Sequence, residues 1–310
     1  MANEDFTTYT EIDPNAHLTV VASKVTFADL SNDEDAYVYK DFGANYFSDS
    51  LGILLTLNLT AMDSTSWNQF YVCSLANLVD DYRGIDTANG DALAVQVYRS
   101  PSLFALSLSE LDGGIEYGSG YHNIASLPVT LYLKLVRDES VGTYGTAYLY
   151  VYSDEARTNL LITLSVTLHS SKKDFRYLYA VQTWNWSAVR PSSGYVENLE
   201  LLALASPIVT TQAVTSISRT TATGNGNVTG LGVPHPTQHG HCWNTTGSPT
   251  TADSKTQNGV KNATGAFTSA ITGLVTGTKY YVRAYATNAQ GTSYGNEVNF
   301  TTFIPKIFYF

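Results

Sequence analysis

The stretch that decides the fold is GLVTGTKYYVRAYATNAQGTSYGNEVNFTT, residues 273–302. From Tyr280 to Thr287 two sets of side chains alternate, and a period of two over eight residues is typical of a half-buried β-strand. A polar turn follows at residues 288–291, and residues 294–302 supply a return strand, so we expect a hairpin. The segment therefore predicts the end of a small antiparallel sandwich.

The composition extends this β character to the whole chain. With 310 residues the chain is long enough for two domains. Charged residues make up 14%, and the 22 tyrosines far outnumber the 4 tryptophans. Tyr and Thr favour pleated, half-exposed surfaces, and runs of helix-forming residues at helical spacing are missing. We predict an all-β protein.

Charge and targeting signals exclude several classes of partner. The net charge of −10 repels a phosphate backbone, so we expect no nucleic-acid partner. No apolar run reaches the roughly 18 residues of a membrane-spanning helix, and the N-terminus MANEDFTTYT does not resemble a signal peptide. The two cysteines, Cys73 and Cys242, are far apart in sequence and are expected in different domains, so we expect no disulfide framework.

The first domain is predicted to cover residues 1–205. Turn signals such as Asn89-Gly90, residues 112–114, 118–120 and 192–194 separate about ten short candidate strands. The candidates are residues 17–27, 36–40, 53–60, 69–78, 92–99, 103–108, 129–137, 146–153, 159–166, 175–182 and 194–204. A unit of this size with so many strands favours a jelly-roll β-sandwich over a seven-stranded immunoglobulin module.

Four segments give this domain its resemblance. They are LYLKLVRDES (131–140), TAYLYVYSDEARTNLLITLSVTL (146–168), DFRYLYAV (174–181) and SGYVENLELLAL (193–204). Together they resemble the concanavalin A-like, laminin-G-like jelly-roll family. That resemblance implies two packed antiparallel sheets and, in many members, a bound glycan or Ca²⁺.

A second domain is predicted over residues 208–303, after a linker that contains Pro207. Its segments TTATGNGNVTGLG (220–232), TQHGHCWNTTGSPTTADS (237–254) and GTKYYVRAYATN (277–288) resemble fibronectin type III and immunoglobulin-like repeats. The resemblance implies a corner role for Tyr280 and a buried Trp243, although Val275-Thr276 replaces the usual turn proline. An apolar tail, residues 304–310, follows.

Aromatic residues form the first candidate site. Trp184 and Trp186 are two residues apart and would share a strand face, with Tyr177 and Tyr179 nearby. Such a platform can stack on sugars. The alternative is that these rings pack the core or a subunit contact.

Carboxylates form the second candidate. Glycosidases of this superfamily place alternating carboxylates on one strand face, and Glu110, Asp112 and Glu116 are the nearest approach to that pattern. A Gly-Gly turn interrupts them, so we expect no catalytic residue and no enzyme.

Metal sites are the third candidate. Asp33 and Asp35 lie in an acidic cluster suited to Ca²⁺, which is the one cofactor the sequence leaves open, although a solvated acidic loop is the simpler explanation. His235, His239 and His241 with Cys242 suggest Zn²⁺, but an ordinary strand explains them as well.

These features predict a non-enzymatic virion or surface structural protein, such as a phage decoration, fibre or tail-associated protein. It would lie on a virion or outside the cell, form a homo-oligomer and contact other assembly subunits. The expected assembly element is the tail, through Ile304, Ile307, Phe308, Tyr309 and Phe310. The alternatives are a carbohydrate-binding adhesin that contacts cell-surface glycans and, third, a degenerate glycoside hydrolase.

Overall fold

The computed structural model describes residues 3–48, 50–172, 174–185 and 189–304, and it is an all-β structure. The chain divides into two compact units, Met1–Ala203 and Leu204–Phe310. Helix among the described residues amounts to the 3-10 turn η1 (Phe6–Thr8) and the six-residue α1 (Tyr82–Thr87). No described helix has the length and apolar character needed to cross a membrane.

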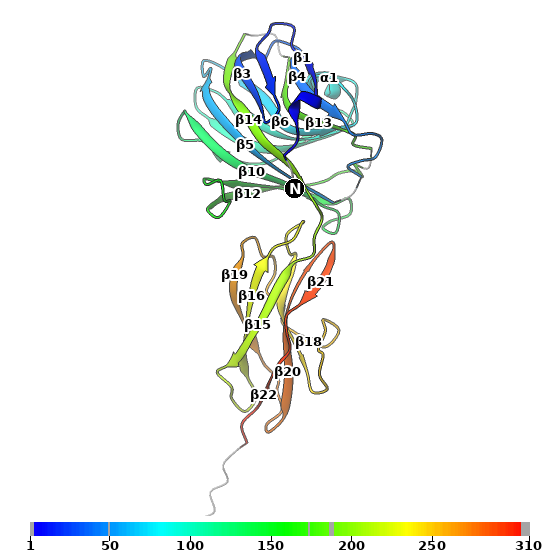
Figure 1. Ribbon diagram of the computed structural model, residues 1–310, viewed down its shortest axis with the longest axis vertical. Coiled ribbons are helices and arrows are strands. Elements are labelled where there is room, and N and C mark those ends of the chain that lie inside the picture. The colour runs from blue at the N-terminus through cyan, green and yellow to red at the C-terminus, as the bar shows by residue number, and fades with distance from the viewer. Residues whose placement is uncertain (1–2, 49, 173, 186–188, 305–310) are drawn as a thin grey trace, which may run out of the picture. The chain divides into compact units, whose positions relative to one another are not determined.

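The first unit is a jelly-roll sandwich of two seven-stranded antiparallel sheets (Figure 1). The first sheet has the order β1 (Thr10–Ile12), β4 (Tyr37–Asp41), β13 (Tyr177–Thr183), β6 (Asn68–Ala76), β7 (Ala92–Arg99), β8 (Phe104–Asp112) and β9 (Ile115–Asn123). The second has the order β12 (Leu160–Thr167), β11 (Thr146–Tyr152), β10 (Val129–Asp138), β5 (Leu51–Met62), β14 (Pro191–Leu202), β3 (Lys24–Ser31) and β2 (Leu18–Val21).

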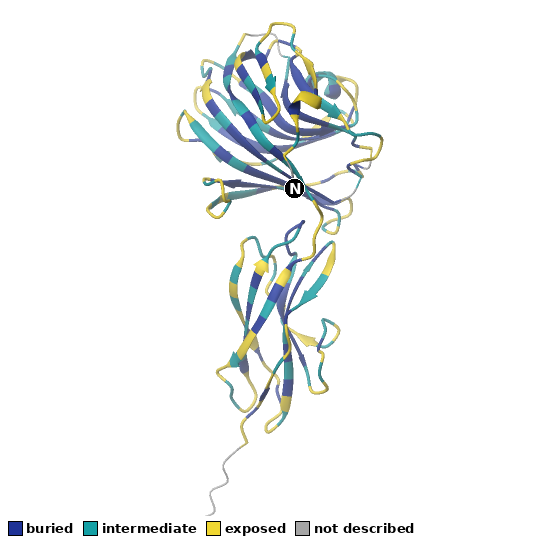
Figure 2. Ribbon diagram, viewed as in Figure 1, coloured by how far each residue is buried: buried dark blue, intermediate teal, exposed yellow. Residues whose placement is uncertain are grey.

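One large apolar core lies between these sheets. It takes alternate residues from both, such as Leu55 and Leu57 from β5 and Leu106 and Leu108 from β8. Figure 2 shows the buried residues concentrated in the strands and the exposed ones in the connecting loops. A second, smaller aromatic cluster lies on the other face of the first sheet, where α1 packs Tyr82 against Tyr71 with ring centroids 3.7 Å apart.

The second unit is a smaller sandwich with two sheets. One has the order β15 (Ile208–Thr215), β16 (Ala222–Gly230) and β19 (Gly265–Ile271). The other has the order β18 (Ser254–Lys255), β17 (Gln238–Asn244), β20 (Lys279–Asn288) and β21 (Gly291–Tyr294), with β22 (Val298–Thr301) also paired to β20.

The two residues singled out in this unit lie in its core. Trp243 packs in the cluster that contains Tyr280, and the Tyr280 hydroxyl accepts a hydrogen bond of 2.9 Å from the Val275 backbone N–H. The predicted single return strand is instead divided into β21 and β22, because the chain leaves β20 between Tyr294 and Val298.

Several sequence-based boundaries differ from the structure. Residues 118–120 and 192–194 were predicted as turns but lie inside β9 and β14, where β14 bulges between Ser192 and Gly194. Strand β9 was missed entirely. The Gly113-Gly114 turn is confirmed, and both glycines have positive φ values, 55° and 81°.

Candidate glycan-binding face

The candidate site lies on the face of the first sheet that points away from the sandwich core. Four neighbouring antiparallel strands, β6 to β9, build it. Register places Gln96 opposite both Tyr71 on β6 and Ser107 on β8, and Ser107 opposite Tyr121 on β9. Because directly opposed residues share a face, these side chains form one row across the strands.

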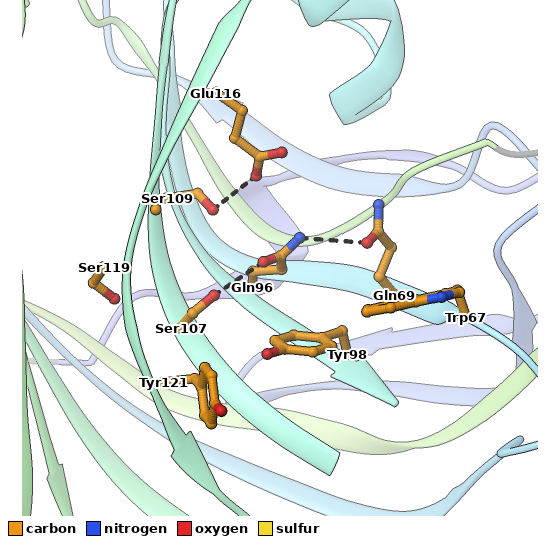
Figure 3. Close-up of a pocket in the computed structure, with 10 residues that line it drawn as sticks. Trp67, Gln69, Gln96, Tyr98, Ser107, Ser109, Glu116, Ser119 and Tyr121 are labelled. Atoms are coloured by element: carbon orange, nitrogen blue, oxygen red, sulfur yellow. Dashed lines mark hydrogen bonds between the residues drawn. The ribbon is translucent and has the colours of Figure 1, made fainter. Parts of the chain in front are cut away.

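An open hollow of about 300 Å³ lies over this row (Figure 3). Its lining residues are Trp67, Gln69, Gln96, Tyr98, Ser107, Ser109, Glu116, Gly118, Ser119 and Tyr121. Gly118 opposes Ser109, and a Cβ at Gly118 would meet no atom within 4 Å. The missing side chain therefore leaves this part of the hollow open.

Aromatic rings border one side of the hollow. Trp67 directly precedes β6 and is 63% exposed, and Tyr121 is 51% exposed. The rings of Trp67 and Tyr98 are nearly parallel, with centroids 5.9 Å apart and planes inclined by 20°. Burial, and then the neighbouring Tyr121, raise the pKa of Tyr98, so the Tyr98 hydroxyl is protonated at neutral pH.

A chain of uncharged polar groups forms the floor. The Ser107 hydroxyl donates to Gln96 Oε1 at 2.9 Å, and Gln96 Nε2 donates to Tyr71 Oη at 3.2 Å and to Gln69 Oε1 at 3.4 Å. These bonds fix the orientation of the Gln96 amide, as Figure 3 shows. The hollow thus presents oriented donors and acceptors beside exposed rings.

Glu116 is the one carboxylate in the lining. Its Oε1 accepts a hydrogen bond of 2.8 Å from Ser109. The side chain is exposed at the surface of the sheet, but the surrounding protein desolvates it in part, and this desolvation raises its pKa. The Ser109 hydrogen bond lowers the pKa in opposition, and the charge of Asp86 on α1 raises it further.

The other two carboxylates of the sequence motif lie elsewhere. Glu110 and Asp112 on β8 both contact the buried Lys172, with Glu110 Oε1 3.5 Å from its Nζ. Glu110 also pairs with His169 at 2.8 Å. Glu110 and Asp112 therefore belong to a structural ion cluster, and only Glu116 faces the hollow.

A second hollow of about 310 Å³ adjoins the first. It is lined by Asn32, Trp67, Gln69 and Trp184, so Trp67 and Gln69 are common to both. Trp184 follows β13, and its ring lies 5.6 Å from that of Tyr82. The second hollow therefore has an indole on two of its sides.

Three of the four predicted sugar-binding aromatics, Tyr177, Tyr179 and Trp184, belong to the aromatic cluster on the outer face of the first sheet, but they differ in exposure. Trp184 lines the second hollow, whereas Tyr179 is fully buried and donates its hydroxyl to the Leu78 carbonyl at 2.9 Å. Tyr177 is half-buried under the Arg176 guanidinium. Trp186 lies outside the described residues. The sequence reasoning missed Trp67, although Trp67, Gln69 and Tyr71 alternate along one face.

The predicted calcium residues are only partly brought together. Asp35 lies with Asp80 and Asp81 so that one oxygen of each is within 4.8 Å of the others. Burial, and then Asp35 and Asp80, raise the pKa of Asp81 to about 7. Asp33 is not in this group and accepts a hydrogen bond from Ser31.

The histidines of the second unit have protein partners. His239 Nδ1 lies 2.7 Å from the Gly259 carbonyl, and His241 Nδ1 lies 2.9 Å from Ser269 Oγ. Among described residues they form no group able to share a metal ion with His235 or Cys242. Burial lowers the pKa of His241 to about 4, which fits a neutral core residue.

Of the predicted assembly tail, only Ile304 lies within the described residues, where it is exposed. Ile307, Phe308, Tyr309 and Phe310 lie outside them.

Comparison with known proteins gives little guidance. No model of a known family matches the chain, and no curated protein matches it. Matches among solved structures include the crystal structure of a beta-1,2-glucanase from Parabacteroides distasonis, with 12% identity and a TM-score of 0.21. The match covers 99% of this chain but 38% of that protein. A TM-score this low establishes neither a shared fold nor a shared activity.

This comparison nevertheless corrects two of our predictions. The prediction of a non-enzymatic virion or surface structural protein is wrong, since the matched protein is a glucanase. The prediction rested on the usual roles of such sandwiches, and a fold does not determine function. The prediction that the protein is no enzyme is likewise wrong, since the matched protein is a glucanase. That prediction rested on the Gly-Gly turn that interrupts the carboxylate motif, but the turn carries the chain into β9, where Glu116 lines the hollow.

Proposed function

We propose that the outer face of β6–β9 binds a carbohydrate. One observation carries the proposal: the exposed Trp67 ring borders a hollow whose floor is a row of oriented, uncharged hydrogen-bonding side chains. We also propose that the first unit is related to concanavalin A-like jelly rolls, which its two seven-stranded antiparallel sheets support.

The aromatic side of the hollow suits the apolar face of a sugar ring. Large exposed apolar groups gathered at one place mark binding surfaces more often than isolated ones do. Trp67 and Tyr121 are both more than half exposed and line the same hollow. Stacking of a pyranose C–H face on these rings removes apolar surface from water, which stabilises the complex.

The polar floor suits the hydroxyl groups of the same ring. Serine hydroxyls and glutamine amides can each both donate and accept, as sugar hydroxyls do. Gln69, Gln96, Ser107 and Ser119 supply such groups from four adjacent segments of the sheet. Because strands hold their side chains at fixed positions, the site is preorganised and binding orders few groups.

The charge of the site favours a neutral glycan. None of the described residues lining either hollow is Lys, Arg or His, and Glu116 is acidic. The whole chain has a net charge of −10. Sulfated or uronic-acid chains would therefore be repelled, whereas neutral hexose and pentose chains would not.

A glycan array followed by affinity measurement tests the proposal. The wild-type protein should bind neutral glycans, and W67A should lower the affinity roughly tenfold or more, as expected when a stacking contact is lost. Tyr144, an aromatic residue 43% exposed elsewhere on the same unit, gives the matched control Y144A. Unchanged affinity in W67A, or no neutral glycan bound, would refute the proposal.

Glycoside hydrolysis is a second candidate function, favoured by the raised pKa of Glu116. A carboxyl that retains its proton can protonate a leaving glycosidic oxygen. The usual mechanism needs a second carboxylate, and Asp86, whose charge contributes to the rise, is the nearest candidate on electrostatic grounds. A carboxyl group with a raised pKa thus lies among the residues that line the proposed sugar site.

Release of reducing ends from a bound neutral glycan tests this second candidate. If Glu116 is the acid, E116Q should retain glycan binding but lose product release. If wild-type protein binds the glycan without releasing product under any pH tested, hydrolysis is refuted while the binding proposal stands.

A further inference from the structure

The two hollows lie next to each other across the sheet, and the Trp67 ring lines both of them. The first extends from Glu116 on β9 to Gln69 on β6, and the second continues from Gln69 to Trp184 beyond β13. Adjacent strands are about 4.8 Å apart, so the path across β9 to β6 alone is on the order of 14 Å long. That length exceeds a single sugar ring.

The second hollow carries its own unsatisfied polar group. Asn32 is 4% exposed and lines the hollow, and its Oδ1 has no hydrogen-bond partner among the described residues. Buried polar side chains are nearly always hydrogen-bonded, so an orphaned amide at a hollow points to a partner that is not protein. A ligand with hydroxyl groups supplies both donors and acceptors to such an amide.

The walls define what fits between them. Trp67 and Trp184 both line the second hollow, and Trp184 is held by packing on Tyr71 and Tyr82. Two indole rings and one amide suit a sugar ring, whose C–H faces are apolar and whose hydroxyl edges are polar. None of the described residues that line this second hollow is basic.

We infer that the second hollow is a separate sugar subsite, so that the ligand is a linear neutral oligosaccharide lying across the strands and passing over Trp67. This inference rests on the proposed carbohydrate-binding function. In this arrangement Glu116 and Ser107 contact one sugar ring of the oligosaccharide. Asn32 and Trp184 contact another sugar ring, at least one position further along the oligosaccharide.

Neutral gluco-oligosaccharide ladders of β-1,3 and β-1,4 linkage, from the monosaccharide upward, test the inference by calorimetry. Wild-type affinity should increase with chain length until both hollows are filled. W184A should leave the affinity for the monosaccharide unchanged. For the longer oligosaccharides it should lower the affinity roughly tenfold, which is the effect of losing about one stacking contact. W67A should weaken every length, because Trp67 belongs to both hollows.

Asn32→Ala provides an independent variant, because Trp184 also supports Tyr82 whereas Asn32 has no ring contact to lose. It should reproduce the chain-length effect in the same direction without a change in melting temperature. Equal affinity of N32A and W184A to wild type at every length would overturn the subsite while leaving the first hollow as a sugar site. Failure of the wild type to bind any ladder would refute the subsite and count against the proposed function itself.

Discussion

The Ser109 hydroxyl donates a hydrogen bond of 2.8 Å to Glu116 Oε1 across the β8–β9 pair. Glu110, the next residue along β8, points to the opposite face and pairs with Lys172. Adjacent residues of β8 thus lie in two different environments. Ser109 hydrogen-bonds the Glu116 carboxylate at the hollow, and Glu110 belongs to a buried ion cluster. The alternation of side chains along a strand imposes this separation.

The Ser109 hydrogen bond predicts a shift in the titration of Glu116. Because the hydroxyl stabilises the ionised carboxylate, S109A should raise the pKa of Glu116 above its wild-type value. Carboxyl carbon NMR titration measures it directly. S107A is the control, because Ser107 bonds to Gln96. A lower or unchanged pKa in S109A would contradict the role of this bond.

Glu116 also predicts a pH dependence of stability. Its folded pKa is raised, so between the unfolded value, about 4.3, and the folded value the native state binds more protons than the unfolded chain. Its contribution to the free energy of unfolding is thus fully present below the unfolded pKa and is lost as pH rises through the folded pKa. The melting temperature of E116Q should therefore rise relative to that of wild type as the pH increases from the unfolded pKa through the raised folded pKa of Glu116. Parallel melting curves at all pH values would contradict this.

Lys172 should be much more important for stability than its single charge suggests. Its Nζ is fully buried and lies 3.3 Å from Asp91 and 3.5 Å from Glu110, besides contacting Asp112. K172M leaves these carboxylates without their cation, and breaking a buried ion pair costs about 3–5 kcal/mol. Urea denaturation at neutral pH measures the loss, and the deficit should shrink in acid as Asp112, whose folded pKa is lowered, takes up its proton. A loss below about 1 kcal/mol, as for a surface pair, would contradict the account.

How far the sequence determined the fold can be judged from individual strands. Residues 92–99 were predicted as a strand and form β7, in which Leu93, Val95 and Val97 face the core and alternate with residues of the other face. Strand β9 was missed because its Gly118-Ser119-Gly120 run has the composition of a turn. It is a strand because β8 pairs with it along its length, and that pairing is set by tertiary contacts rather than local propensity.

The site was less predictable than the fold. Gln96 and Ser107 are ordinary polar residues in sequence, and only their cross-strand register places them side by side. Trp184 was identified because Trp186 follows it two residues later, but Trp67, which lines the same hollow, precedes a strand more than one hundred residues earlier. Spatial adjacency across strands cannot be derived from periodicity alone.

Two glycines give a matched test of the packing. A Cβ on Gly226 in β16 would lie 2.5 Å from the Phe267 ring, whereas one on Gly120 in β9 would meet nothing within 4 Å. G226A should therefore lower the free energy of unfolding of the second unit by about 1–3 kcal/mol through overpacking. G120A should change the first unit by less than about 1 kcal/mol. Equal effects of the two substitutions would contradict the packing described for β16.

The most direct test of the proposed glycan-binding face is an NMR titration that follows the indole N–H signals. The chain has four tryptophans, and Trp243 in the core of the second unit serves as an internal control. Assignment uses the variants W67F and W184F. As a bound neutral oligosaccharide is added, the Trp67 signal should shift in a saturable way, together with Trp184 for longer chains, while Trp243 stays fixed. A saturable titration in which Trp67 does not move would contradict the proposal that this face binds the glycan.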